Sequence, residues 1–282
     1  MFAQLLDEIS ENCKKNNVTN PGDFVKDELL HCGKCRTPKQ CRIEINGTIR
    51  TEFCMCECEN KHYMQEREAF KDMQKRDLIE RRRSTCFHGN SALYDSRFSE
   101  DDGKGNREIF RIFQNYAEDF ETALCENHGL LIYGNVGSGK TFAAACITNK
   151  VIENGYSAYF TNFAEIKNKL WNAENKQDFI NDVCSYDLLV IDDFGTESKS
   201  SYTSEIVTNI FDTRVNRQKP MILTSNFTPE QLKKNGEMEY QRIISRVLGN
   251  CMAIKYVGDD RRGIGRTRHY DFYQKIAGCT HG

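Results

Sequence analysis

The chain has 282 residues, a formal net charge of −2 and thirteen cysteines. Its length suits about two domains of roughly 100 to 200 residues, and its near-neutral charge excludes a general electrostatic attraction to nucleic acid or anionic membranes. The sequence contains no apolar run of bilayer length and no secretory leader pattern, so we expect a soluble protein of the cytoplasm with no membrane partner. Thiols stay reduced there, which favours metal binding over disulfides for clustered cysteines.

Residues 1–60 are predicted to form a small N-terminal domain. Two amphipathic stretches, "FAQLLDEI" and "PGDFVKDELL", predict short helices. Six of the thirteen cysteines then lie within residues 32–58. Between Cys41 and Cys54, apolar and polar residues alternate around Asn46-Gly47, which predicts a β-hairpin with a two-residue turn.

The clustered cysteines have the spacing of a structural zinc site. "HCGKC" gives a first pair, Cys32 and Cys35, and the second pair must come from "CMCEC". Alternation along a strand points Cys54, Cys56 and Cys58 to the same face, so the pattern excludes none of them. We favour Cys56 and Cys58, with Cys54 as the alternative, because the last two lie where the chain turns into the next helix. A redox CxxC centre would need a thioredoxin-like βαβ setting, which is absent here.

A linking helix is predicted for residues 61–88. The stretch from Lys61 to Arg83 has no Gly or Pro, is rich in helix formers, and carries eight Lys or Arg against five Asp or Glu. Such a charged surface fits a solvated helix as well as it fits a binding role. "FHGNSALYDSRFSEDDGKGN" then predicts the loop that leads into a second domain, residues 89–282.

The second domain alternates strands and helices. Apolar runs at 129–134, 156–162, 186–192 and 220–226 predict strands, and helical patterns cover 139–155, a stretch through Trp171, and a stretch near 201–217. Buried strands separated by helices indicate an α/β fold with a parallel sheet covered on both faces.

"GNVGSGKT" at 134–141 fits the phosphate-binding pattern G-x-x-x-x-G-K-[ST]. It follows a predicted strand and opens a predicted helix, as the mechanism requires. Lysine supplies a charge to the β- and γ-phosphates, and the threonine hydroxyl can ligate Mg²⁺. The predicted nucleotide-binding residues are Gly134, Asn135, Val136, Gly137, Ser138, Gly139, Lys140 and Thr141.

Two further strands end in polar residues. "LLVIDDFG" places Asp192 beside the phosphate loop, where it and Thr141 would hold Mg²⁺, and places Asp193 to orient or deprotonate the attacking water. "PMILTSN" ends in Asn226, which can reach that water or the γ-phosphate if its strand lies between the other two. An adjacent acid favours a hydrolysing ATPase over a small-molecule kinase.

Arginines near the C-terminus are further candidates. Arg242 and Arg246 are four residues apart and share one helix face, either as a solvated stripe or with one arginine presented to the nucleotide of a neighbouring subunit. "GDDRRGIGRTRHY" gathers four more arginines that could meet bound phosphates, meet DNA or simply lie at the surface: Arg261, Arg262, Arg266 and Arg268.

Together, "GLLIYGNVGSGKTFAAACITNKVIENGYSAYF", "DLLVIDDFGTE", "IVTNIFDTRVNRQKPMILTSNFT" and "RIISRV" make residues 90 to 270 resemble the AAA+ module of DnaC-type replicative helicase loaders and IstB-like transposition ATPases. The resemblance implies an ASCE-type P-loop ATPase with Walker A at 134–141 and Walker B at Asp192 and Asp193. It further implies sensor 1 at Asn226, an arginine finger at Arg246 and sensor 2 at Arg262. Asp193 departs from the glutamate usual in AAA+ proteins and is one methylene shorter.

The same resemblance implies a purpose. Such loaders bind a DnaB-type replicative helicase through their N-terminal part, self-associate through ATP-bridged interfaces and act on single-stranded DNA. The cysteine-rich N-terminus resembles the zinc-containing domains of loaders in Gram-positive bacteria and their phages. The expected cofactors are ATP, Mg²⁺ and Zn²⁺. Two alternatives remain open: an IstB-like transposition helper, and a nucleotide-dependent adaptor with little turnover.

Overall fold

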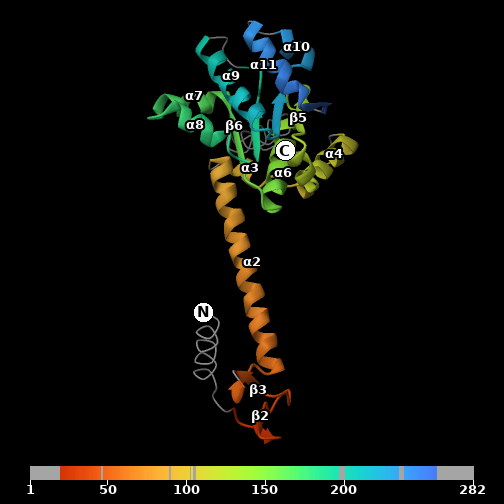
Figure 1. Ribbon diagram of the computed structural model, residues 1–282. Coiled ribbons are helices and arrows are strands. Elements are labelled where there is room, and N and C mark those ends of the chain that lie inside the picture. Colours follow the sequence, from red (N-terminus) through yellow and green to blue (C-terminus); the bar gives the residue numbers. More distant parts are fainter. Residues whose placement is uncertain are drawn as a thin grey trace, which may run out of the picture. The chain divides into compact units, whose positions relative to one another are not determined.

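The computed structural model describes residues 20–45, 47–88, 90–101, 103, 106–196, 201–234 and 238–258 (Figure 1). The chain divides into two compact units, Met1–Asp77 and Leu78–Gly282. The predicted helix in "FAQLLDEI" lies outside the described residues. None of the helices in the described part of the chain combines the length and apolar content needed to cross a bilayer.

The described residues of the first unit form two antiparallel ribbons and the start of a helix. Strands β1 (Phe24–Lys26) and β2 (Leu29–His31) form one ribbon, and β3 (Gln40–Ile45) and β4 (Thr48–Phe53) form the other. The second ribbon confirms the predicted hairpin: Ile45 pairs with Thr48 across the turn, where Gly47 has a φ of +74°. Asn46 of that turn lies outside the described residues.

The predicted helix in "PGDFVKDELL" is wrong, because this stretch forms the β1–β2 ribbon. Its turn residues Asp27 and Glu28 have φ values of +51° and +63°. Two successive residues with positive φ give the turn that matches the right-handed twist of an antiparallel pair. The acidic turn therefore overrides the apolar spacing that suggested a helix.

Helix α2 (Glu57–Phe87) covers the stretch predicted to be helical and begins earlier, at Glu57. Residues 60 to 78 are all exposed, including Phe70 and Met73. Its final turn differs, because Cys86 and Phe87 are buried and Phe87 packs against Phe160 with the ring centroids 5.6 Å apart. The C-terminal end of α2 is thus part of the second unit's core.

The second unit is built on a five-stranded parallel sheet in the order β6-β7-β8-β5-β9. The strands are β5 (Gly129–Tyr133), β6 (Ala158–Asn162), β7 (Leu188–Asp192), β8 (Met221–Ser225) and β9 (Cys251–Lys255). The first four lie within the predicted runs, while β9 was not predicted. Its sequence "CMAIK" is short and half exposed, as is typical of an edge strand.

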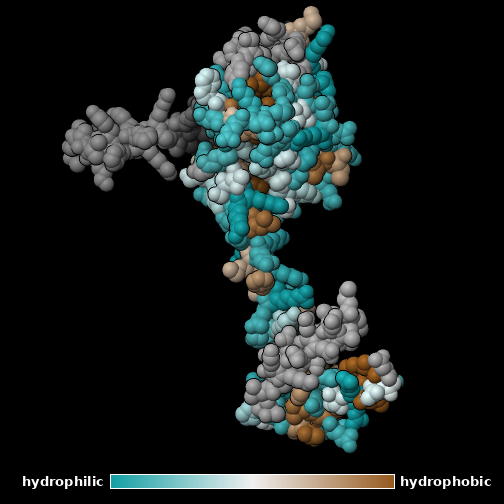
Figure 2. All heavy atoms as spheres, turned by 60° about the vertical axis from the view of Figure 1, so that its left-hand side comes forward, coloured by the Kyte–Doolittle hydropathy of each residue, from teal (hydrophilic) through white to brown (hydrophobic). Residues whose placement is uncertain are grey.

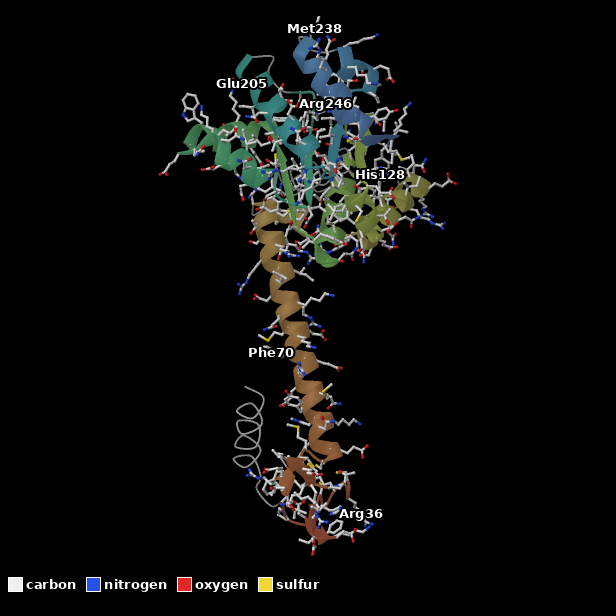
Figure 3. All side chains as sticks on the ribbon, viewed as in Figure 1. Arg36, Phe70, His128, Glu205, Met238 and Arg246 are labelled. Carbon is white, nitrogen blue, oxygen red and sulfur yellow. The ribbon has the colours of Figure 1, made fainter. Side chains whose placement is uncertain are left out.

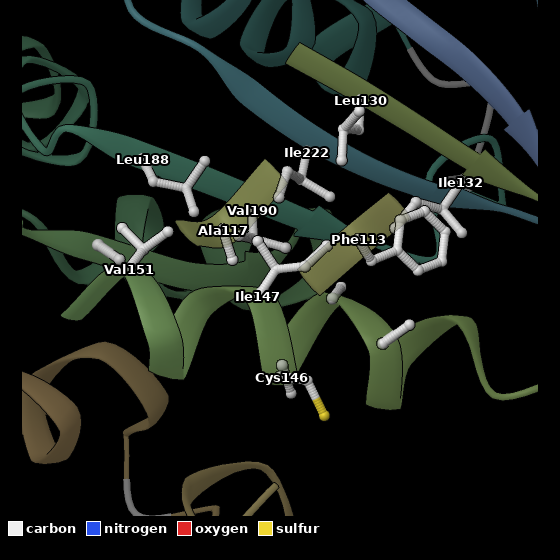
Figure 4. Packing of buried hydrophobic residues seen from close by; sticks show 14 of the residues in the cluster. Phe113, Ala117, Leu130, Ile132, Cys146, Ile147, Val151, Leu188, Val190 and Ile222 are labelled. Atoms are coloured by element: carbon white, nitrogen blue, oxygen red, sulfur yellow. The ribbon is translucent and has the colours of Figure 1, made fainter. Parts of the chain in front are cut away.

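Helices cover both faces of this sheet, and successive strand residues point to opposite sides. Leu130 and Ile132 pack under α4 and α6, as Figure 4 shows, whereas Leu131 packs under the helices of the other face. The surface visible in Figure 2 is largely hydrophilic over this unit. Its helical segments are α3 (Ser91–Tyr94), the 3₁₀ turn Phe98–Glu100, α4 (Arg107–Glu118), α5 (Phe120–Cys125), α6 (Lys140–Glu153), α7 (Phe163–Asn172), α8 (Lys176–Val183), α9 (Ser201–Asn216), α10 (Pro229–Lys234) and α11 (Met238–Gly249).

A buried arginine on α9 hydrogen-bonds the backbone segments that lead into two strands, β7 and β8. Arg214 has 0% of its surface exposed. Its guanidinium donates to the carbonyl oxygens of Cys184 (2.9 Å), Asp187 (2.8 Å) and Pro220 (2.7 Å), and also to that of Tyr186. These carbonyls precede β7 and β8, so a single cation satisfies buried backbone acceptors at the start of both strands.

We expect Arg214→Lys to lower the free energy of unfolding by about 2 to 4 kcal/mol, because an ammonium cannot reach all four carbonyls and leaves buried acceptors unpaired. Urea denaturation of the full chain measures the change. Arg217→Lys is the matched control, since Arg217 is exposed directly after the same helix and bonds Asn181. An equal loss in both variants would contradict the role given to Arg214.

Candidate functional site

The loop between β5 and α6 holds the predicted nucleotide-binding residues. Gly137 and Gly139 have φ values of +79° and +93°, a conformation that favours glycine. At Gly134 an added Cβ would lie 2.0 Å from the carbonyl oxygen of Tyr256, so only glycine fits beside the segment that follows β9. The glycines of the motif therefore allow the loop to curl at the carboxyl edge of the sheet.

Lys140 is the first residue of α6, directly after this loop. Its Nζ donates to the carbonyl oxygens of Gly134 (3.2 Å) and Asn135 (2.8 Å) and to Oδ1 of Asn226 (2.8 Å). The residue is 6% exposed, so its charge is held among oxygen acceptors. Phosphate oxygens are stronger acceptors of the same kind and fit this position.

The position of β8 brings Asn226 to Lys140. Strand β8 pairs with β7 on one side and with β5 on the other. This is the arrangement under which Asn226, directly after β8, was expected to reach the phosphate loop. The strand order thus brings the ends of three strands together at one edge of the sheet.

Asp192 is the last residue of β7, and its carboxylate accepts hydrogen bonds from two hydroxyl groups. The Oγ1 of Thr141 lies 3.0 Å from Oδ1 and 3.1 Å from Oδ2 of Asp192, and the hydroxyl of Thr224 also donates to Oδ1. Burial raises the pKa of Asp192, the Thr224 hydrogen bond opposes that shift, and the neighbouring charge of Asp193 adds to it. A half-buried carboxylate with a hydroxyl oxygen beside it is a donor set that suits Mg²⁺.

Asp193 follows in an unusual backbone conformation. Its φ is +53°, and its N–H donates to Oγ1 of Thr224 at 3.0 Å. Sequence reasoning placed both aspartates at this edge but missed Thr224, which contacts both of them. The only available signal was that "TS" precedes Asn226 at the end of a buried strand.

Ser138 gives a separate observation that bears on a ligand. Its side chain is 0% exposed, and its Oγ has no hydrogen-bond partner among the described residues. A buried hydroxyl without a partner is costly, and a phosphate oxygen within the loop would accept its proton. The residues of the loop therefore fit a bound nucleotide.

The arginine candidates lie elsewhere. Arg246 is on α11, where Figure 3 labels it; its guanidinium pairs with Asp212 of α9, and 51% of its side chain is exposed. Arg242 is exposed on the same helix. The other four lie outside the described residues: Arg261, Arg262, Arg266 and Arg268.

In the first unit, four cysteine sulfurs gather into one group. The Sγ atoms of Cys32, Cys35, Cys56 and Cys58 lie within 4.8 Å of one another. Two of the distances are 3.6 Å, between Cys32 and Cys58, and 3.3 Å, between Cys56 and Cys58. Four sulfurs about 2.3 Å from a tetrahedral zinc ion would be about 3.8 Å apart, so the group could hold zinc. Cys54 is not in this group; its Sγ lies 3.7 Å from the carbonyl oxygen of Pro38.

The surroundings of the cluster favour the thiolate form of Cys35 and disfavour that of Cys56. The Thr37 hydroxyl, together with the N–H groups of Cys58 and Thr37, lowers the pKa of Cys35 to about 5. Burial is the largest effect on Cys56 and raises its pKa. A divalent cation would offset the cost of a buried thiolate. At Gly33, between the first two cysteines, an added Cβ would lie 2.4 Å from the backbone of Gly22, so the β1 segment can approach only a glycine.

Lys39 joins the parts of this unit and was missed by sequence reasoning. It is 1% exposed, and its Nζ lies 3.1 Å from Asp23 and 3.3 Å from Glu59 in the first turn of α2. Its backbone N–H donates to Leu30, and its carbonyl accepts from Cys54. A lysine in a polar stretch gives no sign that it will be buried, so no sequence signal could have found it.

Comparisons with known proteins show which family and relatives the chain is similar to. A family model described as "IstB-like ATP binding protein" matches residues 61–266. The chain is 32% identical over 148 residues to the replicative helicase loader DnaI of Bacillus subtilis (strain 168), covering 48% of this chain and 47% of DnaI. It is 27% identical over 153 residues to the replicative helicase loader DnaC of Escherichia coli (strain K12), covering 52% of this chain and 60% of DnaC. The chain thus spans about half the length of these curated relatives.

Solved structures give the fold. A crystal structure of DnaI superposes with a TM-score of 0.54 at 21% identity, covering 64% of this chain and 99% of that one. A putative primosome component from Streptococcus pyogenes serotype M3 gives a TM-score of 0.52 at 24% identity, covering 60% and 90%. The five-stranded parallel sheet with flanking helices is therefore the AAA+ fold expected from the sequence.

We expect Cys58→Ser to lose bound zinc and Cys54→Ser to keep it, because Cys58 lies in the sulfur cluster and Cys54 does not. Metal content per chain by atomic emission, with Cys41→Ser as a second control, measures this. Chelation should also unfold the first unit, since a unit of this size depends on its metal for folding free energy. Loss of zinc from Cys54→Ser would overturn the assignment.

Proposed function

The chain belongs to the family of IstB-like ATP binding proteins, and from that premise we propose that it is a replication ATPase that loads a DnaB-type helicase onto single-stranded DNA. The observation that carries the ATPase part is the hydrogen-bonded group at the sheet edge. Lys140 bonds Asn226, and Thr141 bonds Asp192, so residues from three separate segments meet at the phosphate loop.

In the proposed reaction each residue has one task. Residues Gly134 to Thr141 cradle the phosphates, and Lys140 exchanges its present acceptors for phosphate oxygens. Thr141 and Asp192 would hold Mg²⁺, which supplies charge neutralisation at the phosphates. Asp193 orients or deprotonates the attacking water, and Asn226 positions that water or the γ-phosphate. The reaction yields ADP and phosphate.

Self-association would complete the site. We propose that Arg246 serves as the arginine finger of a neighbouring subunit, a role supported by its exposure on α11. Arg262 is proposed as sensor 2. We further propose that single-stranded DNA binds the assembled subunits.

The N-terminal part is proposed to bind the helicase. We retain the division into a zinc-binding domain at 1–60, a linking helix at 61–88 and an ATPase domain at 89–282. The zinc ligands proposed are Cys32, Cys35, Cys56 and Cys58. A loader is favoured over a transposition helper because the DnaI and DnaC relatives are named replicative helicase loaders and a cysteine cluster precedes the ATPase domain.

Lys140→Ala should lower ATP turnover by about a hundredfold, since one preorganised charge at the phosphates is removed. Steady-state phosphate release, with and without single-stranded DNA, measures this. Lys150→Ala on the same helix is the control and should turn over ATP at the wild-type rate. Turnover that Lys140→Ala leaves unchanged would exclude the proposed mechanism.

A chain shortened to begin at Leu78 should bind ATP but lose the host's replicative helicase in a pull-down, because the proposed contact lies in the N-terminal unit. This starting point keeps Cys86 and Phe87, which are buried in the second unit's core. The full chain is the positive control, and nucleotide binding verifies that the shortened chain is folded. Equal helicase retention by both chains would disprove the proposed contact.

A further inference from the structure

We propose that Thr224 is a positioning residue for ATP hydrolysis, whose single hydroxyl sets the orientation of both aspartates at the end of β7. The inference rests on the proposed ATPase function and adds a residue outside the motifs used to derive it. Thr224 is on β8, which pairs directly with β5, the strand before the phosphate loop, and it is 0% exposed.

The direction of each hydrogen bond at Thr224 follows from counting protons. A hydroxyl has one proton and two lone pairs. The N–H of Asp193 donates to Oγ1 of Thr224 at 3.0 Å, which occupies a lone pair. The one hydroxyl proton is therefore free to go to Oδ1 of Asp192, the other partner of Oγ1. Replacing the hydroxyl with a methyl group would remove both bonds at once.

Thr224 also stabilises the backbone conformation of Asp193. Asp193 has a φ of +53°, a conformation that costs a non-glycine residue about 1 kcal/mol and needs support from its surroundings. Thr224 supports this conformation by accepting two successive backbone N–H groups, those of Asp193 and Phe194. Its hydroxyl accepts the N–H of Asp193, and its carbonyl accepts the N–H of Phe194 at 2.8 Å.

The next residue on β8 secures the other side of this turn. The hydroxyl of Ser225 donates to the carbonyl of Phe194 at 2.6 Å and accepts the N–H of Phe227 at 3.1 Å. The chain after Asp193 and the chain around Asn226 are thereby joined. Of these two β8 residues, Thr224 is the one whose hydroxyl bonds the aspartates, so its removal tests positioning.

The two hydroxyls on Asp192 have different roles. The hydroxyl of Thr141 is the one assigned to Mg²⁺ in the proposed reaction, whereas that of Thr224 has no such task. The Thr224 bond therefore holds the Asp192 carboxylate in place both with and without nucleotide. Such an indirect partner of a metal ligand is worth about 10- to 100-fold in metal affinity or activity.

The experiment compares Thr224→Val with Thr224→Ser in the full chain. Valine keeps the volume and loses the hydroxyl, and serine keeps the hydroxyl. We expect Thr224→Val to lower kcat about 10- to 100-fold with KM within about threefold of wild type, and Thr224→Ser to stay within about threefold in kcat. Thr148→Val is the matched control: Thr148 is equally buried, bonds the carbonyl of Ala144, and should leave kcat unchanged.

A second readout separates this inference from the ATPase proposal. Affinity for a fluorescent ATP analogue is measured with Mg²⁺ and with EDTA; Thr224→Val should lose most of the Mg²⁺-dependent gain and keep the EDTA value. A wild-type chain without turnover would refute the proposed function, and the Mg²⁺ dependence would still decide on Thr224. If Thr224→Val does not fold, Thr224→Ala takes its place. Wild-type kcat and Mg²⁺ dependence in Thr224→Val, or equal impairment in Thr224→Ser, would overturn the inference.

Discussion

The insertion of β8 between β5 and β7 is the constraint on which the second unit depends. Without it, the phosphate loop after β5 and the aspartates after β7 would be neighbours with no third strand end between them. With it, Asn226 reaches Lys140 while Thr224 reaches Asp192 and Asp193. The registers of β8 with β5 and β7 fix how far each of the three strands extends along the sheet. The positions of the three strand ends are therefore set by the sheet.

The sequence was most informative where one local pattern determined the outcome. Buried apolar strands and the glycine-lysine loop are such patterns, and they predicted four of the strands and the edge where they meet. Contacts between segments far apart in the chain left no local pattern. Arg214, Lys39 and Thr224 are an ordinary arginine, lysine and threonine in sequence, and each is buried by partners that only the fold brings close.

Where the prediction failed, two physical preferences competed. The stretch from Pro21 to Leu30 has helical apolar spacing, yet Asp27 and Glu28 adopt positive φ and close a ribbon. The ribbon is supported by long-range contacts, including the N–H of Gly33 bonded to Asp23 and the N–H of Leu30 bonded to Gln40. The edge strand β9 was missed for a related reason: only pairing with β5 makes it a strand.

The contact between Lys140 and Asn226 has a consequence for binding strength. The ammonium is already bonded to three oxygens of the protein, at 2.8 to 3.2 Å. A phosphate bound at Lys140 must take the place of at least some of these oxygens, so protein acceptors and phosphate compete for one ammonium group. The apparent affinity then reflects a difference between two well-bonded states. Because Asn226 is one of the three acceptors, the residue that follows β8 draws on the same ammonium group as a phosphate would.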